Sequence, residues 1–348
     1  MSAGRTGHGA TGYSRPQDLA IDNDALDTFY GQHADQARAL PPVAIVIAAY
    51  NEEGGIGPVI SALPTTVCGL AAATIVVADG CKDGTVAESR DHGAIVCDVP
   101  VNRGQGAALR LGYRIARDGG AQYIVTTDAD GQYNPAEIDS LLAPVVAGTA
   151  DFVTGSRRLG SEETKDPVRR LGVRVFALTI STLTGQKISD TTFGLRAMRA
   201  EVTGAVRLDQ QQYQAAELLI GVMSRGFRVT ELPATIHKRK VGESKKGHNA
   251  IYGLHFAGVI ARTWWRERVL GGDRRGGARP GALGAGQPGA DQVPGQPAAD
   301  PAAGDRGTAT ASAVPSLAVA PGASGDGADL VVPAPAPPGD ESRSAKRT

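Results

Sequence analysis

The chain has 348 residues, of which 41% are hydrophobic, so it is long enough to bury a sizeable core in one large or two smaller domains. Its 36 basic and 36 acidic residues cancel, which excludes a bulk electrostatic attraction to nucleic acid. The three cysteines, Cys68, Cys81 and Cys97, lack the spacing of a zinc site or a disulfide framework, and this pattern favours a reducing cytoplasm.

The two ends of the chain are predicted to lie outside the folded core. Residues 1–40 contain no apolar run typical of a secretory signal, and we expect a flexible N-terminal arm there. Residues 271–348 are rich in Gly, Pro and Ala and have no aromatic side chain, so a disordered tail is predicted. No apolar stretch approaches the roughly 20 residues of a membrane-spanning helix, and we expect none.

Between these ends, short apolar runs alternate with helical patterns. The runs are apolar on both faces, which is typical of strands in a mostly parallel sheet with helices on both faces. The sequence therefore predicts an α/β fold whose ligands bind beyond the carboxyl ends of the strands. The predicted strands are "VAIVIAA" (43–49), "ATIVVAD" (73–79), "AIVCDV" (94–99), "YIVTTD" (123–128) and "DFVTGS" (151–156).

Polar groups follow every one of these runs. They are, in order, "YNEE", "DGCKDGT", "NRGQGAALR", "DADGQ" and "GSRR". The glycine spacing of a dinucleotide-binding turn is missing after the first run, and no phosphate-binding loop with its Lys-Ser/Thr ending is present. These absences argue against a dehydrogenase and against a P-loop nucleotidase.

Asp128 and Asp130 stand one residue apart where the fourth run ends. Side chains at i and i+2 of a strand end point to the same side, about 6 to 7 Å apart. Two carboxylates at that distance repel by roughly 2 to 3 kcal/mol unless a cation or hydrogen-bond donors lie beside them. A bound Mg²⁺ or Mn²⁺ resolves the conflict, and phosphates of a nucleotide commonly complete such a site. Alternatively, either aspartate caps the helix that follows Pro135.

The ordered motifs resemble the family-2 glycosyltransferases of GT-A (Rossmann-like) fold, especially the polyprenyl-phosphate (dolichyl-phosphate) sugar synthase branch. The resemblance extends over residues 43–246 and ends in "HKRKVGESKKG", which matches the pattern R-x-x-G-x-S-K of that family. The chain departs from the family at Ala48, where proline is usual, and in lacking the C-terminal membrane helices of some relatives. The motifs that carry the resemblance are "AAYNEE", "ADGCKDGT", "NRGQGAALRLGYRIA", "TDADGQYNP", "VTGSR", "DTTFGLRAMR" and "ELPATIHKRKVGESK".

The resemblance implies a role for each motif. The residues expected to bind the nucleotide sugar, with Asp79 reading the base, are Ala49, Tyr50, Asn51, Glu52, Asp79, Asn102, Gly104, Asp128 and Arg157. The expected metal ligands are Asp128, Asp130 and Gln132. The residues expected to be catalytic are Asp130, Asp190, Arg239 and Lys245.

Several neighbouring residues have a structural explanation of equal or greater weight. Asp83 stands in an Asp-Gly turn, which favours a helix cap over a ligand contact. Glu217 fits a catalytic base or, equally, a solvent-facing or capping group, whereas His237 is expected to be structural and Arg158 to lie on the surface. The segment 249–270, with its Trp264-Trp265 pair, fits a helix that packs on the catalytic domain or one that lies in a membrane interface.

The implied function is a metal-dependent, inverting transfer of a sugar from a GDP- or UDP-linked donor to a polyprenyl phosphate, catalysed by a domain at residues 41–248. The protein would be cytoplasmic, with peripheral contact to the inner face of the membrane. A soluble hydroxyl acceptor, a glycan or a small metabolite, is the main alternative and requires a general base, for which Asp190 is the first candidate. A non-catalytic nucleotide-sugar-binding module and a nucleotidyltransferase remain further alternatives.

Overall fold

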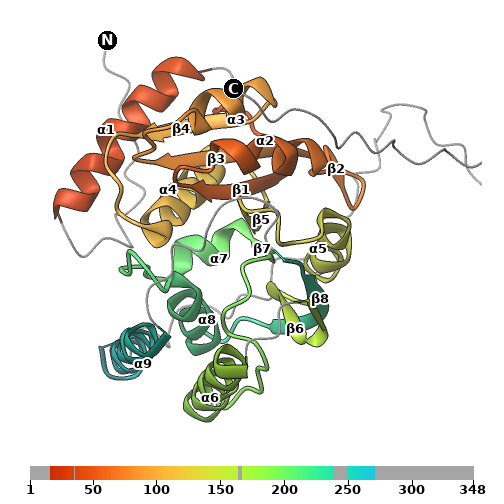
Figure 1. The fold of residues 1–348 in the computed structure, drawn as a ribbon, viewed down its shortest axis with the longest axis vertical. Helices are drawn as coiled ribbons and strands as arrows, with labels where there is room; N and C mark the ends of the chain where they lie inside the picture. Colours follow the sequence, from red (N-terminus) through yellow and green to blue (C-terminus); the bar gives the residue numbers. More distant parts are fainter. Residues whose placement is uncertain (1–15, 35, 164–166, 239–248, 271–348) are drawn as a thin grey trace, which may run out of the picture. The chain divides into compact units, whose positions relative to one another are not determined.

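In the computed structural model, residues 16–34, 36–163, 167–238 and 249–270 are described, and within them the central element is an eight-stranded sheet (Figure 1). The strand order is β4-β3-β1-β5-β7-β6-β8, with the short β2 paired to the start of β3. β4, β3, β1 and β5 are parallel, β7 is antiparallel to both neighbours, and β8 is parallel to β6. The predicted mostly parallel α/β sheet is confirmed. The strands are β1 (Val43–Ala49), β2 (Thr66–Val67), β3 (Leu70–Asp79), β4 (Ile95–Val99), β5 (Tyr123–Asp128), β6 (Phe152–Glu162), β7 (Arg196–Arg199) and β8 (Val229–Ile236).

Helices cover both faces of this sheet. The apolar residues of β1 alternate between two cores, with Val43, Ile45 and Ile47 in one and Ala44 and Val46 in the other. The first core lies under α2 and α5, and the second under α1, α4, α7, α8 and α9. The helices are α1 (Pro16–Gln32), α2 (Glu53–Ala62), α3 (Thr85–Asp91), α4 (Gln105–Asp118), α5 (Ile138–Val146), α6 (Pro167–Thr184), α7 (Ala200–Ala205), α8 (Gln214–Ser224) and α9 (Asn249–Trp265), with a 3₁₀ turn η1 (Pro135–Glu137) and a π-helical turn η2 (Arg266–Leu270).

Three strands were not apparent in the sequence pattern, and each has a reason. β2 is only two residues long, and β7 carries an arginine at each end. β8 contains Glu231 and Pro233, which break the apolar run that marks a buried strand. Proline is tolerated there because β8 is the last strand of the sheet, where a missing backbone donor costs least.

The N-terminal segment differs from the flexible arm predicted for residues 1–40, and that prediction is wrong for residues 16–32. These residues form α1, which packs beside β4 (Figure 1). Ala25, Leu26 and Phe29 are buried in the core, where each apolar side chain contributes free energy to folding. The apolar stripe is only a few residues long and the rest of the helix is polar. The sequence pattern alone therefore does not reveal this helix, and only its packing against β4 does. The expectations for residues 1–15 and 271–348 lie outside the described residues.

The C-terminal helix α9 packs on α8 and α6. Phe256 and Ile260 are buried, and Nε1 of Trp264 donates a hydrogen bond to the carbonyl oxygen of Leu183 at 3.0 Å. These contacts support the packing alternative for residues 249–265, and the membrane-interface alternative stays a prediction. None of the helices within the described residues is long and apolar enough to span a bilayer.

Asp151 joins the starts of β6 and β8 to the end of β7. Its carboxylate accepts hydrogen bonds from Nε and Nη2 of Arg228, at 3.0 and 2.8 Å, and from Nη1 of Arg199 at 3.0 Å. Burial raises the pKa of this carboxyl, but the Arg228 and Arg199 hydrogen bonds outweigh burial and lower the pKa to about 2. The ionised form is thus preferentially stabilised in the folded state.

A pH dependence of stability follows from this depressed pKa. Because the folded-state pKa lies below the unfolded value near 3.9, the stabilisation is present above about pH 4 and is lost as pH falls towards 2. We expect Asp151→Asn to lower the free energy of unfolding at pH 7 by about 1 to 2 kcal/mol, allowing for the half-exposed Arg228. The deficit should disappear near pH 2 in denaturant titrations. An equal deficit at pH 7 and pH 2 would contradict the electrostatic explanation.

Candidate active site

The turns that follow β1 and β3 lie against one another. Asn51 adopts a positive φ of 52°, which asparagine tolerates better than most residues, and its Oδ1 accepts a hydrogen bond from the amide of Lys82 at 2.8 Å. The amide of Asn51 donates to Sγ of Cys81 at 3.4 Å, and that of Glu52 donates to Oγ1 of Thr85 at 2.8 Å. The predicted nucleoside-binding residues 49–52 therefore form a turn whose conformation is held by the next loop of the sheet edge.

Asp83 has a structural role, although the N-cap of α3 is Gly84 and Asp83 is the residue before it. Its Oδ1 accepts hydrogen bonds from the amide and hydroxyl of Thr85, the first residue of α3, and Oδ2 accepts from the amide of Glu53 at 3.2 Å. Burial alone raises the pKa of Asp83, but the hydrogen bonds from Thr85 and Glu53 lower it overall. The carboxylate is engaged in shaping the loop.

Asp79 is the most deeply buried acid at the predicted donor side, with 2% of its surface exposed. Oδ2 accepts hydrogen bonds from the amides of Arg103 and Gly104, at 2.9 and 2.6 Å. Oδ1 is buried and has no hydrogen-bond partner among the described residues. Burial raises the pKa of Asp79, and the two amide hydrogen bonds oppose that rise. A buried acceptor of this kind is costly unless a donor satisfies it, which fits an N–H group of a base.

The loop after β4 approaches its neighbours so closely that a side chain would not fit. Gly104 has φ of 95°, and a Cβ atom added there would stand 2.6 Å from the carbonyl oxygen of Gln211. The amide of Gly106 donates to that same carbonyl at 2.7 Å. Asn102, the other residue predicted to bind the nucleotide sugar in this loop, is exposed. The glycines therefore allow the backbone of this loop to approach Gln211 closely. The side chain of Asn102 lies at the surface.

Asp128 and Asp130 come at the end of β5 and in the turn after it. Oδ1 of Asp128 accepts a hydrogen bond from Nε2 of Gln105 at 2.9 Å, and Oδ1 of Asp130 accepts from the amide of Gln132 at 3.1 Å. Nε2 of Gln132 donates to the carbonyl oxygen of His237 at 2.9 Å. Gly194 approaches Asp128 from β7's side, and a Cβ atom there would lie 2.9 Å from Oδ2.

The helix that follows this turn is capped by another residue. Oδ1 of Asn134 accepts a hydrogen bond from the amide of Ala136 at 3.1 Å and starts η1 at Pro135. Neither aspartate performs this role, so the capping alternative does not account for the pair. The Asn-Pro dipeptide in the sequence is itself a turn signal that points to Asn134.

The donor set suits a hard divalent cation. Within the described ranges, no cluster of three or more His, Cys, Asp or Glu side chains could hold a metal ion by itself. Asp128, Asp130 and the side-chain oxygen of Gln132 supply only oxygen atoms, which Mg²⁺ and Mn²⁺ prefer and which diphosphate oxygens and water commonly complete. The residues fit such an ion as an incomplete set that a bound diphosphate would close.

Arg157 and Asp190 form a buried ion pair beside this turn. Nε of Arg157 donates to Oδ2 of Asp190 at 2.6 Å, and Nη2 donates to Oγ1 of Thr192 at 3.0 Å. Oδ1 of Asp190 accepts from the amide and hydroxyl of Thr192. Burial lowers the pKa of Arg157, but the Asp190 carboxylate outweighs it and the pKa is raised. Both oxygens of Asp190 already accept hydrogen bonds. The geometry therefore favours a role in positioning Arg157 and disfavours the predicted role of proton acceptor.

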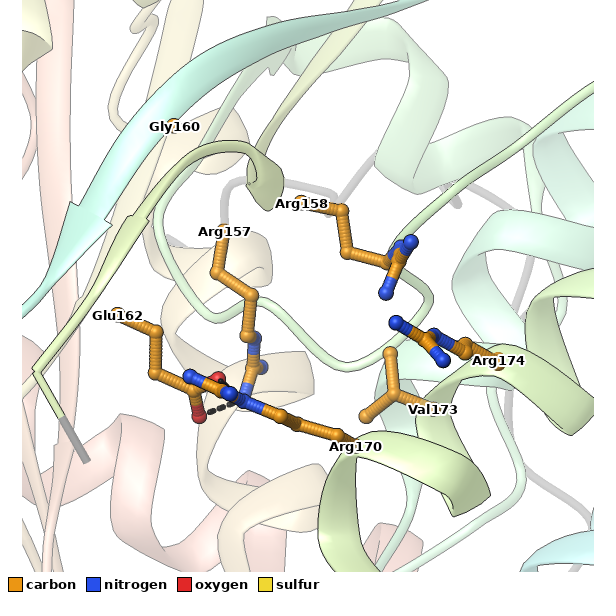
Figure 2. A pocket seen from close by; sticks show the side chains of 7 residues that line it. All are labelled: Arg157, Arg158, Gly160, Glu162, Arg170, Val173 and Arg174. Carbon is orange, nitrogen blue, oxygen red and sulfur yellow. Dashed lines mark hydrogen bonds and ion pairs between the residues drawn. The ribbon is translucent and has the colours of Figure 1, made fainter. Parts of the chain in front are cut away.

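A pocket of about 260 Å³ opens beside Arg157, between β6 and α6 (Figure 2). Figure 2 shows the guanidinium groups of Arg158 and Arg174 turned towards one another, and Arg170 donating from α6 to Glu162. Nη1 of Arg157 is buried, lies 3.8 Å from Glu162, and has no hydrogen-bond partner within the described part of the chain. Four arginines line this pocket, against Glu162 in the lining and Asp190 behind Arg157, so its charge balance suits an anion.

The helix that supplies two of these arginines also exposes an apolar face. Leu171, Val175 and Leu178 are 61%, 51% and 68% exposed and recur at the spacing of one helix face. Their face lies next to that of Arg170 and Arg174, because successive helical residues rotate by about 100°. An anion pocket and an apolar surface are therefore adjacent on α6.

Two of the residues predicted to be catalytic, Arg239 and Lys245, lie outside the described residues. The chain that leads to them is fixed at the predicted metal turn, since the amide of His237 donates to the carbonyl oxygen of Gln132 at 2.8 Å and Tyr133 pairs with Ile236. Glu217 has a structural role. It is fully buried, accepts hydrogen bonds from the amides of Asp209 and Gln210, and pairs with Arg266 at 2.8 Å.

Several residues of the site were missed by sequence reasoning. Gln105 reaches Asp128, and the ring of Tyr133 lies 4.9 Å from that of Phe193, over which Arg157 is placed. The spacing of Arg170 and Arg174 could have indicated a shared basic surface, since two arginines four residues apart on a helix lie on the same face. Arg158, expected on the surface, is exposed but also lines the pocket.

Comparisons with known proteins agree with this geometry. Residues 44–207 match the family model described as glycosyl transferase family 2. The dolichyl-phosphate hexose transferase of Haloferax volcanii is 32% identical over 203 residues, which cover 58% of this chain and 86% of that protein. The undecaprenyl-phosphate mannosyltransferase of Micrococcus luteus is 31% identical over 239 residues, which cover 64% and 93%.

Among solved structures, the chain is similar to glucosyl-3-phosphoglycerate synthase from Mycobacterium tuberculosis in complex with Mn²⁺, UDP and glucosyl-3-phosphoglycerate. The TM-score is 0.51 at 19% identity, covering 74% of this chain and 87% of that one. At this level of identity the likeness concerns the fold, and it agrees with the GT-A type of sheet.

Proposed function

The chain belongs to glycosyl transferase family 2 and is a glycosyltransferase, and from this premise we propose that its acceptor is a polyprenyl phosphate and its donor a nucleotide diphosphate sugar. The observation that carries the proposal is the arginine pocket beside the exposed apolar face of α6. A phosphate on a long hydrocarbon chain has both the charge and the apolar surface that this arrangement fits. The names of the two relatives, each a polyprenyl-type phosphate transferase, support the same acceptor class.

On this proposal the donor lies over the carboxyl ends of β3, β1 and β5. The turn at residues 49–52 would hold the nucleoside, and the unpartnered Oδ1 of Asp79 would accept a hydrogen bond from the base. Asp128, Asp130 and Gln132 would hold Mg²⁺ or Mn²⁺ against the diphosphate. The bound ion would stabilise the negative charge that develops on the leaving nucleoside diphosphate.

The acceptor phosphate would lie against Nη1 of Arg157, with Arg158, Arg170 and Arg174 around it. A phosphate oxygen is already anionic, so it can attack the sugar without losing a proton to a base. This agrees with an Asp190 whose oxygens are engaged with Arg157 and Thr192. Attack from the acceptor side, opposite the leaving diphosphate, would invert the configuration at the sugar carbon.

The test is release of UDP or GDP from a panel of nucleotide sugars with Mg²⁺ or Mn²⁺, with and without a short-chain polyprenyl phosphate. We expect release to require both the metal and the lipid phosphate, and the sugar to move into the organic phase. Metal-dependent release that is indifferent to the lipid would point to a soluble hydroxyl acceptor. Release of pyrophosphate would instead indicate a nucleotidyltransferase, and binding of a nucleotide sugar without turnover a non-catalytic module.

The apolar face of α6 leads to a separate prediction about the membrane. Contact of this face with lipid would bury Leu171 and Leu178, each contributing about 1 kcal/mol for partial burial. We therefore expect Leu171→Ser combined with Leu178→Ser to raise the KM for a long-chain polyprenyl phosphate in liposomes by roughly 30-fold. The KM for a water-soluble short-chain acceptor should stay the same.

Val269→Ser is the matched control for this change, because Val269 is 51% exposed on a different element, η2. Its KM values should equal those of the unmodified chain with both acceptors. If the α6 variant binds liposomes and uses long-chain acceptor normally, the face does not contact lipid. Trp265→Ser, at the exposed end of α9, then tests the other candidate surface.

A further inference from the structure

A fully buried carboxylate lies on α1, outside every motif that carries the resemblance. Oδ1 of Asp22 stands 2.5 Å from Nη2 of Arg103, and Oδ2 stands 3.8 Å from Nε of Arg110. All three side chains are buried, Asp22 completely. Because a charge in a protein core is costly unless it is paired, the carboxylate holds α1 and the two arginines in one arrangement.

Arg103 is held from two sides. Its side chain pairs with Asp22, and its backbone amide donates to Oδ2 of Asp79 at 2.9 Å, beside the amide of Gly104 at 2.6 Å. Asp79 thus receives its two hydrogen bonds from a stretch of backbone that α1 anchors through Asp22. A displacement of the Arg103 backbone would move the Asp79 carboxylate, whose buried Oδ1 is the atom proposed to accept a hydrogen bond from the base.

Arg110 provides a second connection from Asp22 to the same loop. Its Nη1 donates to the carbonyl oxygen of Leu208 at 3.1 Å. Three residues further on, the carbonyl oxygen of Gln211 accepts from the amide of Gly106 at 2.7 Å. Both paths that start at Asp22 therefore end at the backbone of residues 103–106, the loop on which the start of α4 is built.

We propose that Asp22 is a positioning residue for the donor site, which acts through Arg103 to set the loop at residues 102–106 and thereby Asp79. The inference rests on the proposed function, in that this loop and Asp79 bind the nucleotide. Asp22 itself touches no substrate. It makes α1 part of the donor site, although the motifs of the family begin only at Val43.

A packing role alone explains Asp22 poorly. Leu26 and Phe29 already bury the apolar face of α1, and an apolar side chain in place of a buried ion pair is often as stabilising or more so. What a buried ion pair provides is a defined geometry, since charge and hydrogen-bond direction tolerate few arrangements. Here the ion pair fixes the backbone of Arg103 and Gly104, whose amides donate to Asp79.

The experiment measures binding of UDP and GDP to the full chain by calorimetry with Mg²⁺, together with KM values for donor and acceptor. For Asp22→Asn we expect the Kd of the nucleoside diphosphate and the KM of the nucleotide sugar to rise at least 10-fold. The KM of the acceptor should stay within twofold. Asn23→Ala is the control on the same helix, because it removes the contact between Asn23 and Arg114 and leaves Arg103 paired. It should bind nucleotide within twofold of the unmodified chain.

A double variant separates positioning from general weakening. If Asp22 acts through Arg103, then Asp22→Asn combined with Arg103→Gln binds nucleotide no more weakly than the weaker single variant. Losses that add, or an acceptor KM that rises as much as the donor KM, would overturn the inference. Should Asp22→Asn not fold, Arg103→Lys keeps the charge but changes the reach, and the same selective loss of nucleotide affinity is expected.

The outcomes also separate this inference from the proposed function. An unmodified chain that binds neither UDP nor GDP contradicts the donor proposal itself, and the inference falls with it. An unmodified chain that binds one of them, alongside an Asp22→Asn variant that binds equally well, overturns the inference and leaves the proposed function intact.

Discussion

Replacing Asp130 by asparagine is expected to lower kcat by roughly 10² to 10³-fold, the range found when a group that stabilises transition-state charge is removed. Oδ1 of Asp130 accepts a hydrogen bond from the amide of Gln132, and the side-chain oxygen of asparagine can accept the same bond. The turn should therefore persist, while the negative charge that would hold the proposed divalent ion is lost. Nucleoside diphosphate release at saturating substrate measures the effect.

Two further readouts make this prediction specific. The concentration of Mn²⁺ that gives half-maximal activity should rise, and binding of Mn²⁺ in the presence of UDP or GDP should weaken. Asp98→Asn, which removes an exposed carboxylate of β4, is the control and should leave both quantities unchanged. Full turnover in Asp130→Asn with an unaltered metal response would falsify the assignment of Asp130 to the metal.

The second large effect is expected for Arg157→Gln, which removes the central guanidinium of the pocket and leaves Asp190 without its cationic partner. Truncating one member of a buried charge pair costs about 2 to 5 kcal/mol, so kcat/KM for the polyprenyl phosphate should fall by roughly 30-fold to 5,000-fold. The KM for the donor should change much less. Steady-state kinetics with each substrate varied in turn measures the difference.

Arg158→Gln is the matched control for this variant. Arg158 lines the same pocket but is exposed, so water screens its interaction with a phosphate. The loss of this interaction should cost about 1 kcal/mol or less of binding free energy. We expect kcat/KM to fall by no more than roughly 5-fold. Equal effects of the two substitutions would mean that the pocket acts through general charge, without a specific contact to Arg157.

Asp190 distinguishes the two acceptor classes. If Asp190 positions Arg157, then Asp190→Asn should resemble a milder Arg157 variant, with a raised acceptor KM and an unchanged pH profile of kcat. If the acceptor is a hydroxyl and Asp190 takes its proton, the same substitution should abolish kcat and remove the limb of the profile that reports the base. The geometry of the Asp190 carboxylate, bound by Arg157 and Thr192, favours the first result.

Much of the architecture could be predicted from local pattern. The runs at residues 43–49 and 123–128 become β1 and β5 with the predicted bounds, because Val and Ile on both faces suit a strand covered on both sides. The polar residues after each run meet at one edge, since the carboxyl ends of parallel strands lie side by side. Residues such as Asp79 and Asp128 could be found by that reasoning alone.

By itself, then, the sequence determined the order of the strands' motifs, the chemistry of the sheet edge and the family, since these depend on residues that are close together in the chain. Only the tertiary structure decided that residues 16–32 pack as α1, that Asn134 and not an aspartate caps η1, and that Asp190 is bound to Arg157. The pairing of Asp22 with Arg103 joins residues 81 positions apart in sequence, and the arginine pocket draws on β6 and α6. Such contacts depend on which surfaces meet in three dimensions, and no periodicity within one segment encodes them.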